Sequence, residues 1–269
     1  MADPIISVKD LTVVYGTHRV LDGVNLEIER GEVMVLLGGS GSGKTTMLRH
    51  IIGLERPTSG TIRVQGIDVN ACSPEELKKI RRTMGVAFQE AALFNSMSLE
   101  ENVEVPLYEL TTLADPIIEI MTYMDLAAVG LGESAKLSPQ ELSGGMKKRA
   151  AVARAIALDP EILVFDEPSA GLDPIVAAGL DDLILFLKRA FHITMLVVTH
   201  ELASAFRIAD RIAMLYQGSL IAVDGKDAFQ ASKNARIRQF LDRVPDPIGH
   251  SAAVRNRFRE LAGLPGAPA

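Results

Sequence analysis

The sequence predicts an α/β fold with a mostly parallel sheet core, N-terminal antiparallel strands and an inserted helical subdomain. Short apolar segments alternate with helical patterns along most of the chain, which is typical of parallel strands covered by helices on both faces. A glycine-rich loop, Gly38–Thr45, joins the apolar run Val33–Leu37 to a helix that begins near Lys44. From Glu90 to Gln140 helical periodicity dominates and strand patterns are absent, so this region is the predicted insertion.

Composition and charge narrow the classes of protein to which this chain can belong. Its 269 residues are enough for one large domain with a substantial core. No apolar run approaches the ~18 residues needed to span a bilayer, and no signal peptide begins the chain, so we expect a soluble protein. The net charge of −6 argues against nucleic-acid partners, and the single cysteine, Cys72, fits a reducing cytosol.

Alternating apolar residues and capping signals predict the elements before the insertion. Pro57–Gly60 forms a turn, and Ser73 with Pro74 and Glu76 forms a capping box that opens a helix. The predicted strands are Ile5–Tyr15, Val20–Glu29, Val33–Leu37, Thr61–Val64 and Val86–Phe88, and the predicted helices are Thr46–Ile52 and Ser73 to about Met84.

The insertion and the second half of the chain follow the same rules. A loop at Glu90–Met97, with the exposed-looking pair Leu93-Phe94, leads into helices from Ser98 to about Leu110, from Asp115 to Leu126 and from Met146 to Leu158. The strands expected after it are Glu161–Phe165, Thr194–Val198, Arg211–Tyr216 and Ser219–Val223, with helices at Pro174–Arg189 and Glu201–Ala209. From about Val244 the chain is rich in Pro, Gly and Ala, which predicts a flexible tail with one short docking helix near Val254–Leu261.

The glycine-rich loop carries the first chemical signal. Gly38-Gly39-Ser40-Gly41-Ser42-Gly43-Lys44-Thr45 fits the pattern G-x-x-x-x-G-K-[ST] between a strand and a helix, where backbone N–H groups can surround a phosphate. The N-terminus of the helix adds partial positive charge. Lys44 can reach the β- and γ-phosphates of a nucleotide, and the Thr45 hydroxyl can bind Mg²⁺.

Polar side chains follow three other predicted strands. Asp166 and Glu167 come directly after Glu161–Phe165, where a carboxylate can hold Mg²⁺ and a second one can act as a general base. His200 follows the strand Thr194–Val198 and can orient water beside a γ-phosphate. Gln89 follows Val86–Phe88 and can touch the metal or the water. In open α/β sheets ligands bind at the carboxyl ends of strands, so we expect these side chains in one site.

A second helix N-terminus resembles the first in the backbone groups that it offers to an anion. Ser143-Gly144-Gly145 offers an N-cap and free N–H groups, but it has no lysine. One nucleotide needs only one such anion-binding loop. The second one, Ser143-Gly144-Gly145, is called the Ser143 nest below, and it predicts two chains arranged head to tail, each completing the other's nucleotide site. An ordinary capped helix start is the alternative. Tyr15, beside Gly16, is equally compatible with a core position and with a ligand contact.

Taken together, these motifs resemble those of the nucleotide-binding subunit of an ABC transporter, from about Ile5 to Asp242. On this resemblance Tyr15 stacks on adenine, Gly38–Thr45 is the Walker A loop and Gln89 is the Q-loop. Leu142–Met146 matches the signature, Ile162–Asp166 Walker B, Ser169–Asp173 the D-loop and His200 the switch histidine. Two features depart from the usual motifs: Met146 replaces a glutamine, and Ala170-Gly171 stands where Ser-Ala is more common.

The resemblance implies a domain over residues 1–242, with its helical subdomain at about 90–158, that hydrolyses ATP with Mg²⁺ as a homodimer. The catalytic residues implied by the resemblance are Glu167, His200, Gln89 and Lys44. The implied Mg²⁺ site is formed by Thr45, Gln89 and Asp166. One subunit contacts ATP through Tyr15, Gly38, Gly39, Ser40, Gly41, Ser42, Gly43, Lys44, Thr45, Thr46, Gln89 and His200, and the opposing subunit through Ser143, Gly144, Gly145, Met146 and Asp173.

A narrower resemblance is to the Mla-type ATPases of phospholipid transport. It rests on Phe88-Gln89 followed by Ala91–Phe94, on Glu101–Val103, on Pro106-Leu107, on Leu142–Met146 and on Arg236–Leu241. It implies a peripheral protein on the cytoplasmic face of the inner membrane. It also implies a permease docking near Gln89–Met97, a STAS-domain protein, a periplasmic MCE-domain protein, and a C-terminal extension, residues 243–269, that contacts the sister subunit. The alternatives are the ATPase of an amino-acid or other small-solute importer, a soluble ABC ATPase of DNA repair or translation, and a phosphate-loop enzyme with a small substrate.

Overall fold

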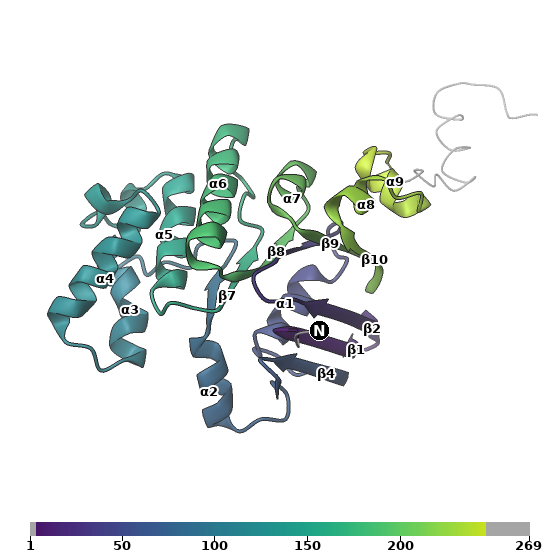
Figure 1. Ribbon diagram of the computed structural model, residues 1–269, viewed down its shortest axis with the longest axis horizontal. Helices are drawn as coiled ribbons and strands as arrows, with labels where there is room; N and C mark the ends of the chain where they lie inside the picture. Colours follow the sequence, from purple (N-terminus) through teal and green to yellow (C-terminus); the bar gives the residue numbers. More distant parts are fainter. Residues whose placement is uncertain (1–3, 246–269) are drawn as a thin grey trace, which may run out of the picture. The chain divides into compact units, whose positions relative to one another are not determined.

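The computed structural model describes residues 4–245 (Figure 1). The chain divides into two compact units, Met1–Ala231 and Ser232–Ala269. The predicted limits of 1–242 for the domain and 243–269 for an extension stay a prediction, and the docking helix expected near Val254–Leu261 lies outside the described residues. Among the helices of residues 4–245, none is long and apolar enough to cross a membrane.

A six-stranded sheet forms the centre of the first unit. Its order is β10-β9-β3-β8-β7-β6, and every neighbouring pair is parallel except β9 with β10. The strands are β3 (Val33–Leu37), β6 (Met84–Ala87), β7 (Ile162–Asp166), β8 (Thr194–Thr199), β9 (Arg211–Tyr216) and β10 (Ser219–Gly225). The residues of β3, β7 and β8 are buried throughout, as expected for parallel strands covered on both faces, so the predicted mostly parallel core is confirmed.

A four-stranded antiparallel sheet, in the order β2-β1-β4-β5, forms the second layer. Its strands are β1 (Ile6–Tyr15), β2 (His18–Ile28), β4 (Ser59–Val64) and β5 (Ile67–Asp68). The N-terminal antiparallel strands are therefore confirmed. Two details of the sequence interpretation were wrong. Ser59 and Gly60 belong to β4 and not to a turn, because Ser59 still pairs with Thr12 of β1. Strand β5 was missed because two residues show no alternation.

The main core lies on the face of the large sheet that meets α1 (Lys44–Ile51) and the antiparallel sheet. Alternate strand residues such as Met34, Leu36, Val164 and Leu196 join one buried cluster with residues of α1 and β1. Helix α1 thus has its buried side in this core while its N-terminus is at the carboxyl end of β3. Helix packing therefore fixes the position of the phosphate loop that precedes α1.

The predicted helical insertion is also confirmed. Helices α3 (Leu99–Leu110), α4 (Asp115–Ala128) and α5 (Gly144–Ile156) pack side by side (Figure 1), with short 3₁₀ turns at Gly132–Ser134 and Pro139–Glu141. The capping box of Ser98 and Glu101 is present as predicted.

The strand before the insertion begins earlier than its pattern predicted. Helix α2 (Pro74–Arg82) ends at Arg82, β6 starts at Met84, and Phe88 is exposed rather than part of a buried strand. A Cβ at Gly85 would lie 2.0 Å from the carbonyl oxygen of Ala155, so β6 and α5 touch backbone to backbone. Glycine is rare in strands, which is why the strand pattern was placed too late.

The C-terminal elements are mostly those predicted. Helix α6 (Pro174–Phe191) precedes β8, and α7 (Leu202–Ile208) precedes β9. The short helices α8 (Lys226–Gln230) and, in the second unit, α9 (Ala235–Leu241) were not predicted as helices. Segments of this length hold too few turns to show helical periodicity.

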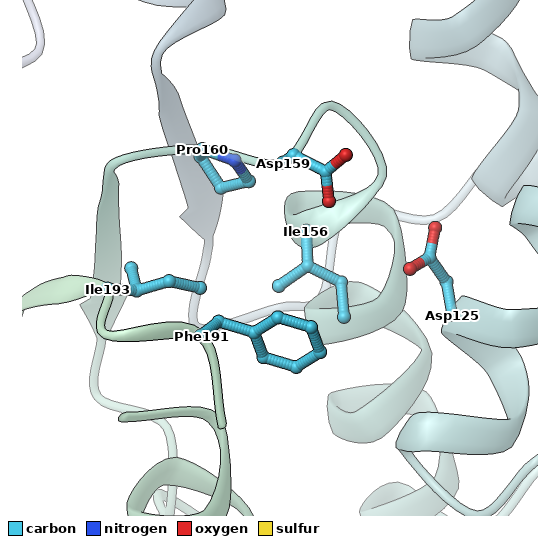
Figure 2. A pocket seen from close by; sticks show the side chains of 6 residues that line it. All are labelled: Asp125, Ile156, Asp159, Pro160, Phe191 and Ile193. Carbon is cyan, nitrogen blue, oxygen red and sulfur yellow. The ribbon is translucent and has the colours of Figure 1, made fainter. Parts of the chain in front are cut away.

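A small pocket of about 120 Å³ lies at the amino ends of the parallel strands (Figure 2). It is lined by Asp125, Ile156, Asp159, Pro160, Phe191 and Ile193. Burial, and the nearby charge of Asp159, raise the pKa of Asp125 to about 7. This end of the sheet therefore holds a carboxyl group that is close to half-protonated at neutral pH.

Candidate active site

The phosphate loop makes close contacts that leave no room for a side chain at two of its glycines. A Cβ at Gly38 would lie 2.4 Å from the carbonyl oxygen of Leu215, and one at Gly43 would lie 2.7 Å from Leu21. Gly43, the N-cap of α1, also has a φ of 105°, which L side chains rarely adopt. Glycine at these two positions is therefore a steric requirement of the loop.

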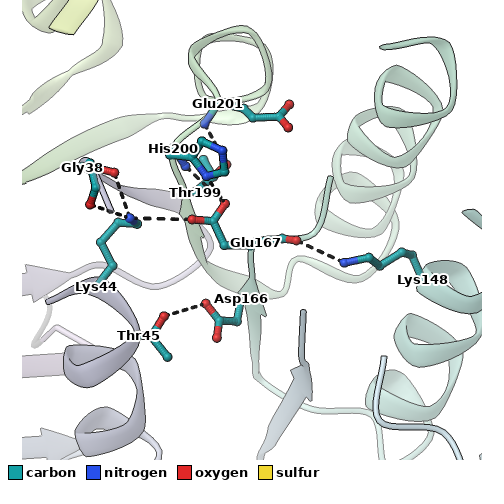
Figure 3. A network of polar contacts seen from close by, with 10 residues as sticks. Gly38, Lys44, Thr45, Lys148, Asp166, Glu167, Thr199, His200 and Glu201 are labelled. Carbon is teal, nitrogen blue, oxygen red and sulfur yellow. Dashed lines mark hydrogen bonds and ion pairs between the residues drawn. The ribbon is translucent and has the colours of Figure 1, made fainter. Parts of the chain in front are cut away.

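Lys44 is only 7% exposed and curls back over the loop (Figure 3). Its Nζ donates to the carbonyl oxygens of Gly38 at 2.8 Å and Gly39 at 3.2 Å. Burial lowers the pKa of Lys44, and the nearby carboxylate of Glu167 opposes that shift. The loop therefore holds a cation where phosphate oxygens would lie.

A cavity of about 310 Å³ opens above the loop, between Gly41–Thr46 and the β2 residues His18 and Val20. The buried Oγ of Ser42 has no hydrogen-bond partner within the described residues. Most buried polar atoms in proteins are satisfied, so this hydroxyl, together with the glycine backbone, suits an anion such as phosphate.

The carboxyl end of β7 supplies two acidic side chains that differ in their surroundings. Asp166, 6% exposed, accepts a hydrogen bond of 3.3 Å from the Thr45 hydroxyl, and burial raises its pKa. Glu167 has a left-handed φ of 49°, and its N–H donates to the carbonyl oxygen of Val198 at 2.8 Å. This backbone turn directs the two neighbouring side chains to different partners.

Glu167 lies between a lysine and a histidine (Figure 3). Its Oε1 is 3.7 Å from Lys44 Nζ, and its Oε2 is 2.8 Å from His200 Nδ1. A carboxylate oxygen only accepts hydrogen bonds, so His200 carries its proton on Nδ1 in this contact. The structure thus brings together Lys44, Thr45, Asp166, Glu167 and His200, which the sequence predicted to form one site.

Gln89 reaches this group through its backbone and through a residue that sequence reasoning missed. The Nζ of Lys148 donates to the carbonyl oxygen of Gln89 and, at 3.2 Å, to that of Glu167. No sequence motif assigns a role to Lys148. Its position one helical turn after Gly144 was the only available signal, because the contacts themselves join segments far apart in sequence.

The loop after Gln89 is bound tightly to α5. Arg154 donates to the carbonyl oxygens of Ala92 at 2.7 Å and Ala91 at 3.0 Å, and its guanidinium lies over the Phe94 ring. Both alanines have positive φ values, 60° at Ala91 and 49° at Ala92. Leu93 is half-buried and only Phe94 of the predicted exposed pair is exposed, because Asn102 binds the backbone of Phe94 in both directions.

The second nest is formed but lies apart from the first. Ser143 caps α5 by accepting the Met146 N–H at 3.3 Å, and both Ser143 and Gly144 are exposed. Asp173 caps α6 by accepting the N–H groups of Ile175 and Val176, and Tyr15 donates to Glu55. Within residues 4–245, no hydrogen bond or ion pair joins Ser143, Asp173 or Tyr15 to the phosphate loop. In one copy of the chain these groups therefore bind their own neighbours and take no part in the phosphate site.

The donors near Asp166 fit a hard divalent cation that shares its ligands with a nucleotide. Among the described residues, no group of three or more His, Cys, Asp or Glu side chains could hold a metal ion by itself. The Thr45 hydroxyl and the Asp166 carboxylate are adjacent, and Mg²⁺ binds through one or two carboxylates together with phosphate oxygens and water. The site therefore suits Mg²⁺ carried with a nucleotide.

Comparisons with known proteins agree with this geometry. The family model described as ABC transporter matches residues 21–170. The protein named "Intermembrane phospholipid transport system ATP-binding protein MlaF" from Escherichia coli K12 is 40% identical over 242 residues, covering 90% of each chain. The protein named "Probable ribonucleotide transport ATP-binding protein mkl" from Mycobacterium leprae is 43% identical over 247 residues, covering 91% of this chain and 71% of that protein.

Solved structures show the same fold. The ATP-binding cassette MJ0796, in a dimeric post-hydrolysis state bound to ADP and Pi, aligns with a TM-score of 0.76 at 32% identity over 82% of this chain and 98% of that one. The cbiO1 protein of Clostridium perfringens, part of the transporter complex cbiONQ, aligns with a TM-score of 0.79 at 28% identity over 90% and 98%. The chain belongs to the ABC transporter family, as one of its ATP-hydrolysing subunits.

Proposed function

We propose that this chain powers the transport of phospholipid across the cell envelope, together with a membrane permease. The observation that carries the proposal is the 40% identity to MlaF of Escherichia coli across 90% of both chains. A match over nearly the whole length includes the helical insertion as well as the nucleotide motifs. MlaF of Haemophilus influenzae extends the match to 97% of this chain at 38% identity.

Hydrolysis would take place at the carboxyl end of the sheet. Glu167 would accept a proton from the attacking water, a role supported by the contact between its Oε2 and His200 Nδ1 at 2.8 Å. Lys44 and the backbone N–H groups of Gly38–Thr45 would bind the β- and γ-phosphates, with Ser42 and Thr46 completing the cradle. Tyr15 is 49% exposed at the end of β1, where adenine could stack on its ring.

Mg²⁺ would be held by Thr45, Asp166 and Gln89 together with phosphate oxygens. When bound, it neutralises charge on the phosphates. Asp166 already accepts the Thr45 hydroxyl, so these two groups are preorganised. Gln89 lies on a loop whose backbone is held by Lys148, which leaves its side-chain amide available to the site.

The exposed nest supports a homodimer. Ser143, Gly144, Gly145 and Met146, with Asp173 of the same copy, would face the nucleotide held by the Gly38–Thr45 loop of the other copy. Ser143 and Gly144 are exposed to solvent, whereas a Cβ at Gly145 would lie 2.5 Å from Val176. The Ser143 nest therefore packs against α6 on one side and is accessible to a ligand on the other. A helix N-terminus with free N–H groups attracts the negative charge of a γ-phosphate.

The permease would dock at the loop Gln89–Met97, where the exposed ring of Phe94 lies beside Arg154. This loop connects the surface to the active site through Gln89, so docking and hydrolysis can affect each other. A STAS-domain protein and a periplasmic MCE-domain protein complete the proposed assembly, and the chain would lie on the cytoplasmic face of the inner membrane.

The test is reconstitution of the full chain with its permease in phospholipid vesicles. ATP hydrolysis should rise when the permease is present, and labelled phospholipid should move only with ATP and the wild-type chain. The Glu167→Gln variant keeps the size of the side chain but should not hydrolyse ATP, so it is the control that shows whether lipid movement requires hydrolysis. Hydrolysis without any lipid movement would contradict the phospholipid assignment while leaving the ATPase assignment intact.

Ribonucleotides are a second candidate substrate class, because the protein named mkl is 43% identical to this chain. An amino acid or another small solute remains the alternative predicted from the motifs. The same vesicles can be loaded with a labelled ribonucleotide or a mixture of labelled amino acids. ATP-dependent movement of one of these solutes, with no movement of phospholipid, would replace the proposal.

A further inference from the structure

One ammonium group connects the two backbone segments that carry the proposed Gln89 and Glu167 functions. Lys148 Nζ donates to the carbonyl oxygen of Gln89, just after β6. It also donates to the carbonyl oxygen of Glu167, just after β7 (Figure 3). The helix that presents Lys148, α5, begins at the Ser143 nest. Lys148 is half-buried, and the acidic groups Glu90, Asp166 and Glu167 surround it.

Its contact with Glu167 acts on an unusual backbone. Glu167 has a φ of 49°, a left-handed conformation that is unfavourable for a residue with a side chain. The N–H of Glu167 is held by Val198 and its carbonyl oxygen by Lys148, so the residue is fixed at both ends. The direction of the carboxylate toward His200 and Lys44 follows from this backbone orientation.

We propose that Lys148 is a positioning residue for ATP hydrolysis, which holds the backbones of Gln89 and Glu167 so that both side chains face the nucleotide. The proposal rests on the functions proposed above for Gln89 and Glu167. Lys148 does this through carbonyl oxygens, which need a donor and not a particular side chain. An arginine at this position should therefore serve, whereas an apolar side chain of the same length should not.

The test compares variants of the full chain at position 148 with a matched control at its neighbour. Lys148→Met removes every donor while keeping the length of the side chain, and Lys148→Arg keeps the donors. Lys147→Met makes the same change one residue away, at a side chain with no hydrogen bond or ion pair among the described residues. We expect Lys148→Met to lower kcat for ATP about 10- to 100-fold with KM changed less than twofold, Lys148→Arg to recover to within about threefold, and Lys147→Met to match wild type.

A kcat for Lys148→Met equal to that of Lys147→Met would overturn the proposal, as would an increase in KM at unchanged kcat. If Lys148→Met does not fold, Lys148→Gln takes its place, because its amide nitrogen is one bond nearer the backbone than Lys Nζ and so falls short of the carbonyl oxygens that Lys148 reaches. It should also lower kcat, and a wild-type kcat would overturn the inference. Glu167→Gln is measured beside these variants. Normal turnover in Glu167→Gln would contradict the proposed function itself, whereas an inactive Glu167→Gln with an active Lys148→Met contradicts only the role of Lys148.

Discussion

The two ends of the parallel sheet differ in whether neighbouring groups compensate the charge of a carboxylate. At the carboxyl end, Glu167 lies between Lys44 and His200, so each charge faces an opposite charge or a donor. At the amino end, Asp125 faces the second carboxyl group of Asp159 across an apolar pocket (Figure 2). Burial penalises charge at both ends, but only the first end offers compensation. Compensated charges can serve catalysis, whereas the uncompensated carboxyl group reduces stability at neutral pH.

The largest expected effect comes from removing the compensating cation. Lys44→Ala should lower ATP turnover by about 10³-fold, because the phosphates lose their charge partner and Glu167 and Asp166 lose theirs. Steady-state hydrolysis assays, with circular dichroism to confirm folding, measure this effect. Lys147→Ala, which removes an equal charge outside the site, is the control. Comparable loss in both variants would mean that net charge, not the position of Lys44, matters.

The next effect comes from neutralising the compensated acid. Glu167→Gln should lower kcat by about 10²- to 10³-fold and leave ATP binding intact, because the amide keeps its size but cannot accept the proton of water. Equilibrium binding of a labelled nucleotide and gel filtration with ATP test both halves of the prediction. We expect a stable dimer with ATP that wild type forms only transiently. Retained turnover would exclude Glu167 as the general base.

At the amino end the expected effect is on stability and has a definite sign. The folded-state pKa of Asp125, about 7, lies above its ordinary value of 3.8, so the folded protein binds more protons than the unfolded chain between these values. Stability should therefore fall as pH rises from about 4 to about 7, and stay level above that. Asp125→Asn should remove this loss and stabilise the protein at pH 8 by roughly 1–3 kcal/mol, which is less than the ~4 kcal/mol of the full shift because the pocket is open to solvent.

Urea unfolding at pH 5 and pH 8 measures this difference. At pH 5 the Asn variant should gain only about a third of what it gains at pH 8, because Asp125 is still protonated in the folded state but already ionised in the unfolded chain. An equal change at both pH values would indicate an effect of packing rather than of charge.

The smallest effect separates burial from repulsion within the same pocket. Asp159→Asn should lower the pKa of Asp125 only partly, because burial is the larger cause and the Asp159 charge the smaller. The gain in stability at pH 8 should be a few tenths of a kcal/mol. Titration of Asp125 by NMR in this variant measures the change directly. A return of the pKa to about 3.8 would reverse the order of the two causes.

Features that depend on neighbouring residues could be predicted from the sequence. The Gly38–Thr45 loop, the uniformly apolar strands and the capping boxes are of this kind, and they were enough to predict the fold and the grouping of Asp166, Glu167 and His200. Contacts between backbones that are distant in sequence could not be predicted. The early start of β6 depends on contact with α5 at Gly85, and the contacts of Lys148 and Arg154 depend on how α5 lies over the loop after Gln89.

The contact at Gly85 has a mechanical consequence. Helix α5 rests on β6 at Ala155, near its C-terminal end, while the Ser143 nest is at its other end. At 1.5 Å per residue, the distance along the axis from Ala155 to Gly144 is about 16 Å. A rigid rotation of ~10° about this pivot would therefore displace the nest by roughly 3 Å, about the length of one hydrogen bond. Helix α5 has the geometry of a lever arm, on which a small tilt at the sheet is enough to make or break the proposed contact with a nucleotide held by another copy.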